Sequence, residues 1–432
     1  MMKRRKLTVR ATWLAFLLSA LAIAQPPQRP LREVNEVARP AAKQIIAITG
    51  ATLIDGRGGA PVLDAVVVIR GDKIVAVGTR KAIVIPKGAE VLEARGLTVL
   101  PGLIDSHFHI DGDNELPALF LQHGVTSLRD PGEWMHSYEA PRTSGAPIPR
   151  LFLADPHLDS IGPAYPEDAV VVRDADEARN AVNRAVDRGA SSIKVYFRLP
   201  LGLIKVVNET AHARGVPVTA HLEIVAATDA IRAGVDGIEH VTSFGTSLLD
   251  PRDAEVYRQA ILKDNNARRE GRYKMWSEID LASPRVKDVL DLLVKRGTFL
   301  SATLAVFEKR AGDKDATDMH VRGFANMLKF VGLAKKAGAR IVAGSHSSVP
   351  HAERGWAYQR ELELLVESGL TPMQAIVAAT TEQARFFRSA ERLGSVEAGK
   401  LADLILVEGD PNKDIRAMRR VQRVMLNGKW IH

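Results

Sequence analysis

The sequence of 432 residues contains no cysteine. A disulfide, a thiolate metal ligand and a lipid-modified cysteine are therefore all excluded. Any metal site in this chain must be built from histidine, from carboxylates or from a modified lysine. With 46% hydrophobic and 25% charged residues, the chain has a globular composition and is long enough for one large domain or two.

A strong charge of one sign is also missing, although the formal net charge is +8. Five of the positive charges lie in the first 24 residues, which contain no acid: Lys3, Arg4, Arg5, Lys6 and Arg10. The rest of the chain has a net charge of +3, which is not the basic footprint of a nucleic-acid-binding protein. We therefore expect no nucleic-acid partner.

The N-terminal apolar stretch, Ala11 to Ala24, has 14 residues and falls short of the roughly 20 that a membrane-spanning helix needs. Its basic flank and the small residues before Gln25 are typical of a cleaved secretory signal over residues 1–24. An uncleaved membrane anchor is the alternative. We expect a periplasmic or secreted protein with no stable membrane insertion after cleavage. Residues 25–44, rich in proline, glutamine and charge, are predicted to be a flexible linker.

Short strands separated by glycine-containing turns occupy both ends of the remaining chain. They are Ile45 to Ile48, Ala65 to Ile69, Lys73 to Val77, Ala402 to Val407 and Val421 to Leu426. Their shared pattern predicts one composite β-sandwich domain, built from residues 45–103 and 390–432.

The middle of the chain, residues 104–389, alternates strands with helices. The strand candidates are Val99 to Ile104, Val125 to Leu128, Leu151 to Ala154, Ser192 to Phe197, Val216 to Leu222, Gly237 to Val241, Thr298 to Leu304 and Ala339 to Ala343. Capping signals at Asp174 and at Thr371-Pro372 mark helix starts. Eight alternations predict an α/β fold, a (β/α)8 TIM barrel with its active site at the carboxyl ends of the strands.

Two histidines, His107 and His109, follow the first of these strands. Alternate residues of a strand share a face, so both imidazoles can bind one metal ion while Phe108 points away. Taken alone, such a pair is equally well explained as two histidines whose hydrogen bonds are satisfied in a core or on the surface. The other candidates are Lys194 within the fourth strand, His221 and His240 at the ends of the fifth and sixth, and His346 just past the eighth. All fall at the mouth that the barrel predicts.

Lys194 interrupts an apolar strand, where an unpaired charge would be costly. Either it pairs with a carboxylate or it is a metal ligand. Because a cationic amine cannot lie between metal ions, the ligand role requires an anionic carbamate. Tyr196 lies two residues further on the same strand face. It is either a hydrogen-bond donor to a developing oxyanion or a buried tyrosine with a structural partner.

Several motifs, taken in order, resemble the amidohydrolase superfamily. They are Pro-Gly-Leu-Ile-Asp-Ser-His-Phe-His at 101–109, Ile-Lys-Val-Tyr at 193–196, Thr-Ala-His at 219–221, Ile-Glu-His at 238–240, the run from Glu361 to Pro372, and Gly-Lys-Leu-Ala-Asp-Leu at 399–404. The chain is most similar to the imidazolonepropionase-like branch, which includes prolidase-type metal-dependent dipeptidases. The resemblance covers Ile45 to the C-terminus.

The resemblance implies a distorted barrel with a small composite β-sandwich, and zinc as the cofactor in a site for one or two metal ions. In that family the strand-one histidines bind a first zinc, a carboxylated lysine bridges two metals, and the histidines of strands five and six bind the second. By position these are His107, His109, Lys194, His221 and His240. A bound metal can bring the pKa of water to about 7 and polarise the scissile carbonyl, so no side-chain nucleophile is required.

The sequence departs from the family after the eighth strand. There this branch typically has an aspartate that contacts the first metal and takes a proton, whereas this chain has His346. Three interpretations remain open. Neutral His346 replaces the aspartate as ligand or base, the site has kept its fold but lost catalysis, or His351 or Glu353 in the following loop substitutes.

Between strands six and seven the chain inserts a charged, helix-prone stretch, Asp250 to Arg296. It lies on the catalytic side of the predicted barrel and could form a lid. Arg272 and Lys274 within it would suit a substrate carboxylate, with a solvated surface helix as the alternative.

These features predict an exported metal-dependent amidohydrolase that cleaves a C–N bond, most readily in a dipeptide or another small amide. A non-catalytic small-molecule binding protein with the same fold is the main alternative, and a cyclic amide or a lactone is an alternative substrate. We expect a small-molecule partner and leave a homo-oligomer open.

Overall fold

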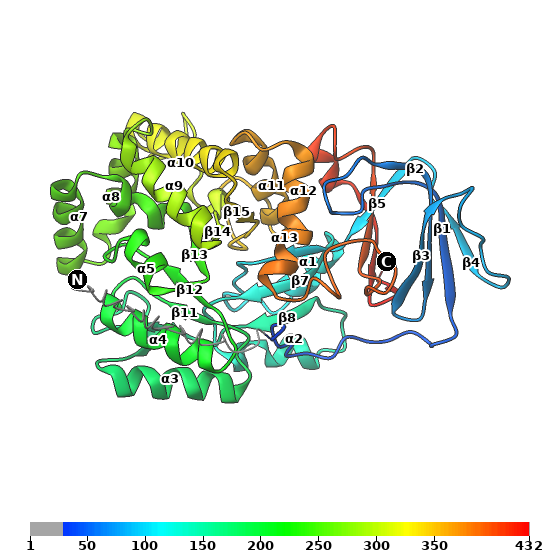
Figure 1. Ribbon diagram of the computed structural model, residues 1–432, viewed down its shortest axis with the longest axis horizontal. Helices are drawn as coiled ribbons and strands as arrows, with labels where there is room; N and C mark the ends of the chain where they lie inside the picture. Colours follow the sequence, from blue (N-terminus) through cyan, green and yellow to red (C-terminus); the bar gives the residue numbers. More distant parts are fainter. Residues whose placement is uncertain (1–28, 432) are drawn as a thin grey trace, which may run out of the picture.

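The computed structural model describes residues 29–431 as two structural parts (Figure 1). One is a barrel of parallel strands covered by helices. The other is a mixed sheet at one side of the barrel, to which both ends of the chain contribute. The predicted signal segment, residues 1–24, lies outside the described residues.

The barrel contains the eight strands that the sequence predicted, all in parallel register with their neighbours. They are β6 (Leu103–Asp105), β7 (Val125–Asp130), β8 (Arg150–Leu153), β11 (Ile193–Val195), β12 (Val218–His221), β13 (Gly237–Glu239), β14 (Phe299–Ser301) and β15 (Arg340–Val342). The first three form one sheet and the rest another. Single backbone hydrogen bonds from Ser191 to Leu153 and from Ser106 to Ala343 join the two sheets. The predicted distorted barrel is confirmed.

Two short strands at the barrel were not predicted. These are β9 (His157–Asp159) and β10 (Ala169–Val171), and β9 pairs with β11. The sequence of β9, His-Leu-Asp, has a single apolar residue, so no apolar run marks it. The consequence for function is that His157 joins the barrel wall.

Helices cover the outside of the barrel (Figure 1). They are α1 (Leu116–Gln122), α2 (Glu139–Thr143), α3 (Ala175–Arg188), α4 (Leu201–Ala213), α5 (Ala227–Ala233), α6 (Gly245–Leu248), α7 (Pro251–Lys263), α8 (Ala267–Glu278), α9 (Pro284–Arg296), α10 (Asp318–Ala337), α11 (Ala357–Glu367), α12 (Pro372–Ala379) and α13 (Thr381–Phe386). Asp174 caps α3 by accepting hydrogen bonds from the next turn, and Thr371 and Gln374 form a capping box on α12, as predicted.

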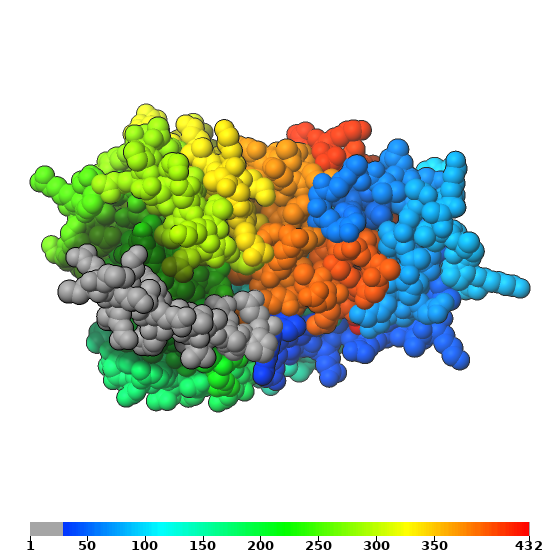
Figure 2. Space-filling view, in the orientation of Figure 1, coloured from blue at the N-terminus to red at the C-terminus, as the bar shows by residue number. Residues whose placement is uncertain are grey.

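The mixed sheet follows the order β18-β17-β16-β5-β1-β2-β3, with β4 also paired to β1. Its strands are β1 (Ile45–Leu53), β2 (Val62–Arg70), β3 (Lys73–Thr79), β4 (Glu90–Glu93), β5 (Leu97–Pro101), β16 (Leu404–Glu408), β17 (Val421–Leu426) and β18 (Lys429–Trp430). Buried apolar residues from β1, β2, β16 and β17 share one core cluster. The space-filling view shows the blue N-terminal residues packed against orange and red C-terminal ones (Figure 2).

The apolar run Val99 to Ile104, expected as one barrel strand, is divided between the two parts. Its first half belongs to β5 in the mixed sheet and its last residues to β6 in the barrel, with Gly102 between them. A Cβ on Gly102 would lie 2.2 Å from Oγ1 of Thr126, so no side chain fits there. The close approach to β7 requires glycine and turns the chain from one sheet into the other.

Residues 29–44 differ from the flexible linker that we expected over residues 25–44. Leu31 is buried, and its backbone N–H donates to the carbonyl oxygen of Phe387. The N–H of Val34 donates to Leu151, and Asn35 bonds to the backbone at Pro149 and Leu151. A polar, proline-rich composition did not reveal these contacts, because each depends on a groove formed by distant segments. Within the described chain, no helix has the length and apolar character needed to cross a membrane.

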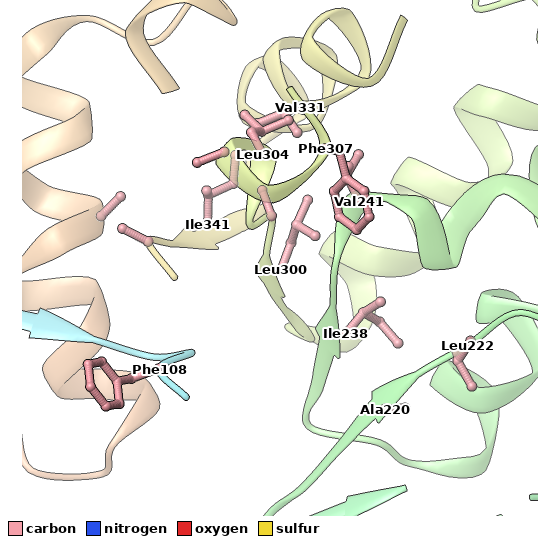
Figure 3. Packing of buried hydrophobic residues seen from close by; sticks show 14 of the residues in the cluster. Phe108, Ala220, Leu222, Ile238, Val241, Leu300, Leu304, Phe307, Val331 and Ile341 are labelled. Carbon is pink, nitrogen blue, oxygen red and sulfur yellow. The ribbon is translucent and has the colours of Figure 1, made fainter. Parts of the chain in front are cut away.

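The barrel strands present apolar side chains outwards to the covering helices. Ile238, Leu300 and Ile341, on neighbouring strands, pack outwards in one cluster with Val331 of α10 (Figure 3). Successive residues of a strand point to opposite faces. Glu239 and other buried polar residues therefore occupy the barrel interior, away from the apolar interface between the strands and the helices.

A buried arginine joins the barrel to the chain ends. Arg150 of β8 forms ion pairs with Asp403, whose Oδ2 lies 2.8 Å from its Nε, and with Glu33, and it donates to Asn427. Its guanidinium is almost fully buried, so these partners replace its hydration. The contact ties three segments that are far apart in sequence.

We predict that Arg150→Met lowers the stability of the whole protein by about 3–5 kcal/mol, because it leaves buried carboxylates without a counter-charge. Urea unfolding followed by circular dichroism measures the change. The control is Arg173→Met, which removes an exposed arginine paired with Glu177 on the surface and should leave the midpoint unchanged. Equal midpoints for wild type and Arg150→Met would show that the buried cluster contributes nothing.

Candidate metal centre and active site

A polar cavity of about 420 Å³ opens at the carboxyl ends of the barrel strands. Its lining includes the predicted residues His109, Lys194, Tyr196, His221, His240, Arg272 and His346. His107 is completely buried and contacts His109 through its ring. The structure therefore brings together residues separated by as many as 239 positions in the printed sequence.

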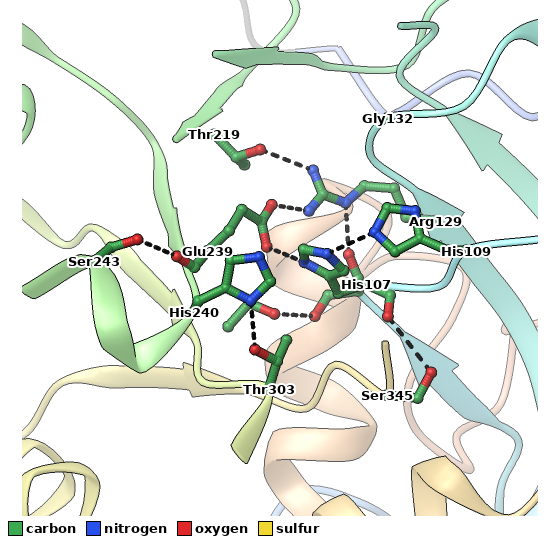
Figure 4. A network of polar contacts seen from close by, with 12 residues as sticks. His107, His109, Arg129, Gly132, Thr219, Glu239, His240, Ser243, Thr303 and Ser345 are labelled. Atoms are coloured by element: carbon green, nitrogen blue, oxygen red, sulfur yellow. Dashed lines mark hydrogen bonds and ion pairs between the residues drawn. The ribbon is translucent and has the colours of Figure 1, made fainter. Parts of the chain in front are cut away.

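His107 and His109 are held so that their Nε2 atoms face each other, 3.1 Å apart (Figure 4). Nδ1 of His107 lies 2.7 Å from Oε2 of Glu239, and Nδ1 of His109 lies 3.3 Å from Oδ1 of Asp130. A carboxylate only accepts hydrogen bonds, so each neutral ring carries its hydrogen on Nδ1. The two facing Nε2 atoms then both carry lone pairs, an arrangement that a shared cation stabilises. The donor set fits a metal ion.

His346 completes a group of three at this position. One ring nitrogen from each of His107, His109 and His346 lies within 4.8 Å of the others. The backbone N–H of His346 donates to the carbonyl oxygen of His107 at 2.7 Å. Asp105 accepts from the N–H groups of both His107 and Ser345, which fixes the loop after β15 against the end of β6.

His221 and His240 form a second pair, with ring centroids 4.4 Å apart. Nε2 of His221 lies 3.3 Å from Glu223, and its buried Nδ1 has no hydrogen-bond partner among the described residues. Nδ1 of His240 lies 2.6 Å from Oγ1 of Thr303. Each ring thus has one nitrogen oriented by a neighbour and one left for a ligand, as metal-binding histidines require.

Backbone strain is concentrated at these strand ends. His240, Thr303, His346 and Ser347 all have left-handed φ values, of +66°, +47°, +57° and +58°. Such values are uncommon for residues other than glycine, and for a β-branched residue such as threonine they are outliers. Residues held in strained conformations cluster at functional sites, where the surrounding structure imposes them. Here the strained backbone directs the rings of His240 and His346 into the cavity.

Lys194 lies in the interior wall and is only 3% exposed. It forms no ion pair within residues 29–431, so the alternative of a lysine paired with a carboxylate is not what the structure shows. Burial lowers the pKa of Lys194 to about 8. Near neutral pH a substantial fraction of the amine is therefore unprotonated, which is the form that can become a carbamate.

Burial also disfavours positive charge on the histidines of the site. It lowers the pKa of His221 to about 4, and with the charge of Lys194 it lowers the pKa values of His107, His240 and His346. For His109, burial opposes the positive form, but the carboxylate of Asp130 raises its pKa. Neutral imidazole is the form that binds metal ions.

An arginine and a glutamate support the site from inside the barrel (Figure 4). The fully buried guanidinium of Arg129 pairs with Glu239, and it donates to the backbone carbonyl of Ser106 at 2.8 Å and to Thr219 at 3.2 Å. Glu239 in turn orients His107. These contacts connect β7, β12, β13 and the end of β6 to His107, a candidate metal ligand.

The predicted side-chain positions around the substrate need one correction. Tyr196 is buried beside His221, with ring centroids 4.6 Å apart, and Arg272 lines the cavity. Lys274 is exposed and does not line it. On a helix, residues four apart share a face while residues two apart do not. Helix α8 forms part of the cavity wall with Arg268 and Arg272, and exposed Arg269 also lines it, whereas Lys274 does not.

Neither alternative to His346 in the following loop reaches the cavity. His351 is held 2.9 Å from Asp313, and Glu353 is exposed. His346 is the residue of this loop that the cavity contains.

Sequence reasoning missed several residues of the site. Asp130 and Glu239 are the last residues of β7 and β13, so the strand-end rule that found the histidines would also have found them. His157 lines the cavity with a buried Nε2 that has no partner in the described chain. No signal in the sequence marks it, because it begins a strand of only three residues that was not predicted.

Comparison with known proteins agrees with this geometry. The Amidohydrolase family matches residues 98–431. Ochratoxinase from Aspergillus niger is 24% identical over 449 aligned residues, covering 88% of this chain and 85% of that protein. An uncharacterised protein of Mycobacterium tuberculosis is 25% identical over 375 residues, covering 77% of this chain and 84% of that protein.

Solved structures show the same fold. A crystal structure of A. niger ochratoxinase has a TM-score of 0.71 at 22% identity, covering 90% of this chain and 96% of that one. A Xaa-Pro dipeptidase with bound methionine has a TM-score of 0.69 at 23% identity, covering 90% of this chain and 99% of that one. With a family match over most of its length and this arrangement of histidines around Lys194, the chain belongs to the amidohydrolase family.

Proposed function

We propose that this amidohydrolase is an exported, metal-dependent enzyme that hydrolyses the peptide or amide bond of a dipeptide or similar small molecule. The observation that carries the proposal is the arrangement of four histidines around buried Lys194. Each ring has one nitrogen oriented by a carboxylate or hydroxyl and the other free. Such preorganised ligands serve metal-assisted hydrolysis.

Zinc is the proposed cofactor, because neutral imidazole nitrogens suit it and the chain has no thiolate. His107 and His109 would hold one ion, and His221 and His240 a second, with Lys194 as a carbamate between them, which leaves the neutral ring of His346 free to act as a base. When bound, such an ion polarises a carbonyl oxygen and brings the pKa of water to about 7.

The side chains of the cavity then have distinct roles. Tyr196 and His157 lie together, with ring centroids 4.3 Å apart, where their free donors can bind the carbonyl oxygen of the substrate. Neutral His346 is placed to accept a proton from the attacking water and to return it to the leaving amine. No side-chain nucleophile is needed for this hydrolysis.

A dipeptide-like substrate is supported by the cavity and by the names of relatives. Three arginines of α8 line one side of the cavity, which attracts a carboxylate. The similar proteins include a Xaa-Pro dipeptidase and, over a short segment, an N-acyl-D-aspartate deacylase. The basic start and apolar stretch of residues 1–24 support export, and with it an extracellular or periplasmic substrate.

One observation favours a second candidate function. A histidine, His346, stands where the resembling enzymes typically have an aspartate, which removes one negative charge from the site. A binding protein that retains the fold and the metal but lacks catalysis would show the same change.

The first prediction separates these two functions. If His346 transfers the proton, His346→Ala lowers kcat by about 10²–10⁴-fold while the protein stays folded, and His346→Asp retains or raises activity. Turnover of a panel of dipeptides, cyclic amides and lactones by metal-loaded protein measures this. A metal-loaded wild type without activity, together with an active His346→Asp variant, would establish the binding protein instead.

The second prediction concerns Lys194. As a carbamate it is an anionic ligand, so Lys194→Ala should bind at least one metal equivalent less than wild type. Elemental analysis after dialysis gives the metal content, and ¹³C NMR after incubation with labelled bicarbonate detects the carbamate. Its formation should increase as the pH rises through about 8, because burial lowers the pKa of this amine to that value. Full metal content and activity in the variant would exclude the bridging role.

The third prediction tests the support of His107. Glu239→Gln removes the charge that orients this ring, so we expect zinc affinity to fall by about 10- to 100-fold. Competition with a chelating dye measures the affinity. The control is Glu382→Gln, which breaks ion pairs with Arg340 and Arg385 outside the cavity. An equal affinity in both variants would contradict a role of Glu239 in metal binding.

A further inference from the structure

Helix α8 contributes three arginines to the cavity lining, of which Arg269 is exposed, and the other two differ strongly in electrostatic state. Arg268 and Arg272 are four residues apart and so lie on one face of the helix. Both line the cavity. What distinguishes them is the presence of a counter-charge.

The charge of Arg272 is already balanced inside the protein. Its Nη2 lies 3.1 Å from Oε1 of Glu223, and the hydroxyl of Tyr257 donates to the other oxygen of that carboxylate at 2.5 Å. Glu223 also holds His221. Arg272 therefore belongs to a cluster that positions a histidine, and its guanidinium is not free to neutralise a substrate.

The charge of Arg268 has no such partner. Its side chain is buried, with 3% of the residue exposed, and in the described part of the chain no carboxylate forms an ion pair with it. Nη1 donates to the backbone oxygen of Asn265 at 2.7 Å and Nη2 to the hydroxyl of Tyr165 at 2.8 Å. Nε is buried without any hydrogen-bond partner. Burying a cation without a counter-charge costs free energy. The position of Arg268 is therefore suited to bind an anion from outside the chain.

The surroundings of Arg268 place that anion near the candidate metal centre. The guanidinium lies 5.4 Å from the ring centroids of Tyr165 and of Phe197. The ring of Tyr165 is 6.1 Å from that of Tyr196, which in turn contacts His221. Two aromatic side chains, Tyr165 and Tyr196, thus connect the unpaired cation to the histidines, along the wall that a bound substrate would follow.

Acidic residues elsewhere in the cavity lining repel an anion. Asp111, Glu133 and Asp168 line the cavity, and burial together with the charge of Glu133 raises the pKa of Asp168 to about 6. A substrate carboxylate is therefore stabilised at α8 and destabilised beside the acids. This asymmetry gives the substrate one orientation.

Building on the function proposed above, we propose that Arg268 binds the carboxylate of the leaving amino acid. The substrate class is then dipeptides and N-acyl amino acids that end in a free carboxylate. Neutral amides, cyclic amides and lactones without this group are poor substrates. Tyr165 orients Arg268, and Arg272 contributes through Glu223 to the position of His221.

The test compares alanyl-proline and alanyl-phenylalanine with their C-terminal amides on metal-loaded protein. Wild type should prefer each free acid by about 10- to 100-fold in kcat/KM, since a charge-assisted guanidinium–carboxylate contact is lost in the amide. Arg268→Met should lower kcat/KM for the acids by a similar factor, mainly through KM, and leave the amides unchanged. Arg268→Lys should recover part of the preference. Lys274→Met, an exposed charge on the same helix, is the control and should behave as wild type.

The outcomes separate this inference from the proposed function. If acids and amides are hydrolysed equally by wild type and by Arg268→Met, the carboxylate role is overturned while the hydrolase stands. If no peptide is hydrolysed, the proposed function fails, and calorimetric binding of the same four compounds then decides the role of Arg268. Equal affinity of wild type for acids and amides overturns it, and this comparison holds even if Arg268→Met does not fold.

Discussion

The ion pair between Arg129 and Glu239, sealed inside the barrel, is the interaction on which the site depends. The barrel interior excludes water, so neither charge is tolerable there without the other. Once paired, Glu239 has its second oxygen left for His107, and the guanidinium ties together the ends of several strands. The geometry of the metal-ligand candidates follows from this pairing.

The same lack of water sets the protonation states of the site. Burial disfavours positive charge on His221 and on Lys194, whose pKa values fall to about 4 and about 8. The neutral forms that result are those that accept a metal ion or become a carbamate. Arg268 carries a guanidinium, a group that is always charged in proteins. It stays charged and retains its need for an anion.

Much of the fold was predictable because it follows from local patterns. The eight barrel strands alternate apolar and polar residues or form apolar runs, and Asp174 and Thr371 mark helix starts through hydrogen bonds to the next turn. The run ending at Ile104 was assigned to one strand because periodicity cannot show that Gly102 turns the chain between two sheets. The segment around Leu31 was assigned to a linker because its partner, Phe387, is remote in sequence.

The sequence by itself determined which residue types stand at the strand ends, and so that His107, His109, Lys194, His221 and His240 would meet. A parallel barrel brings the carboxyl ends of all its strands to one side, whatever the details of packing. Only the tertiary structure decided which charges are balanced. Arg268 and Arg272 are equivalent in sequence, yet one is neutralised by Glu223 and the other is not. That difference arises from contacts across the barrel, which no local pattern encodes.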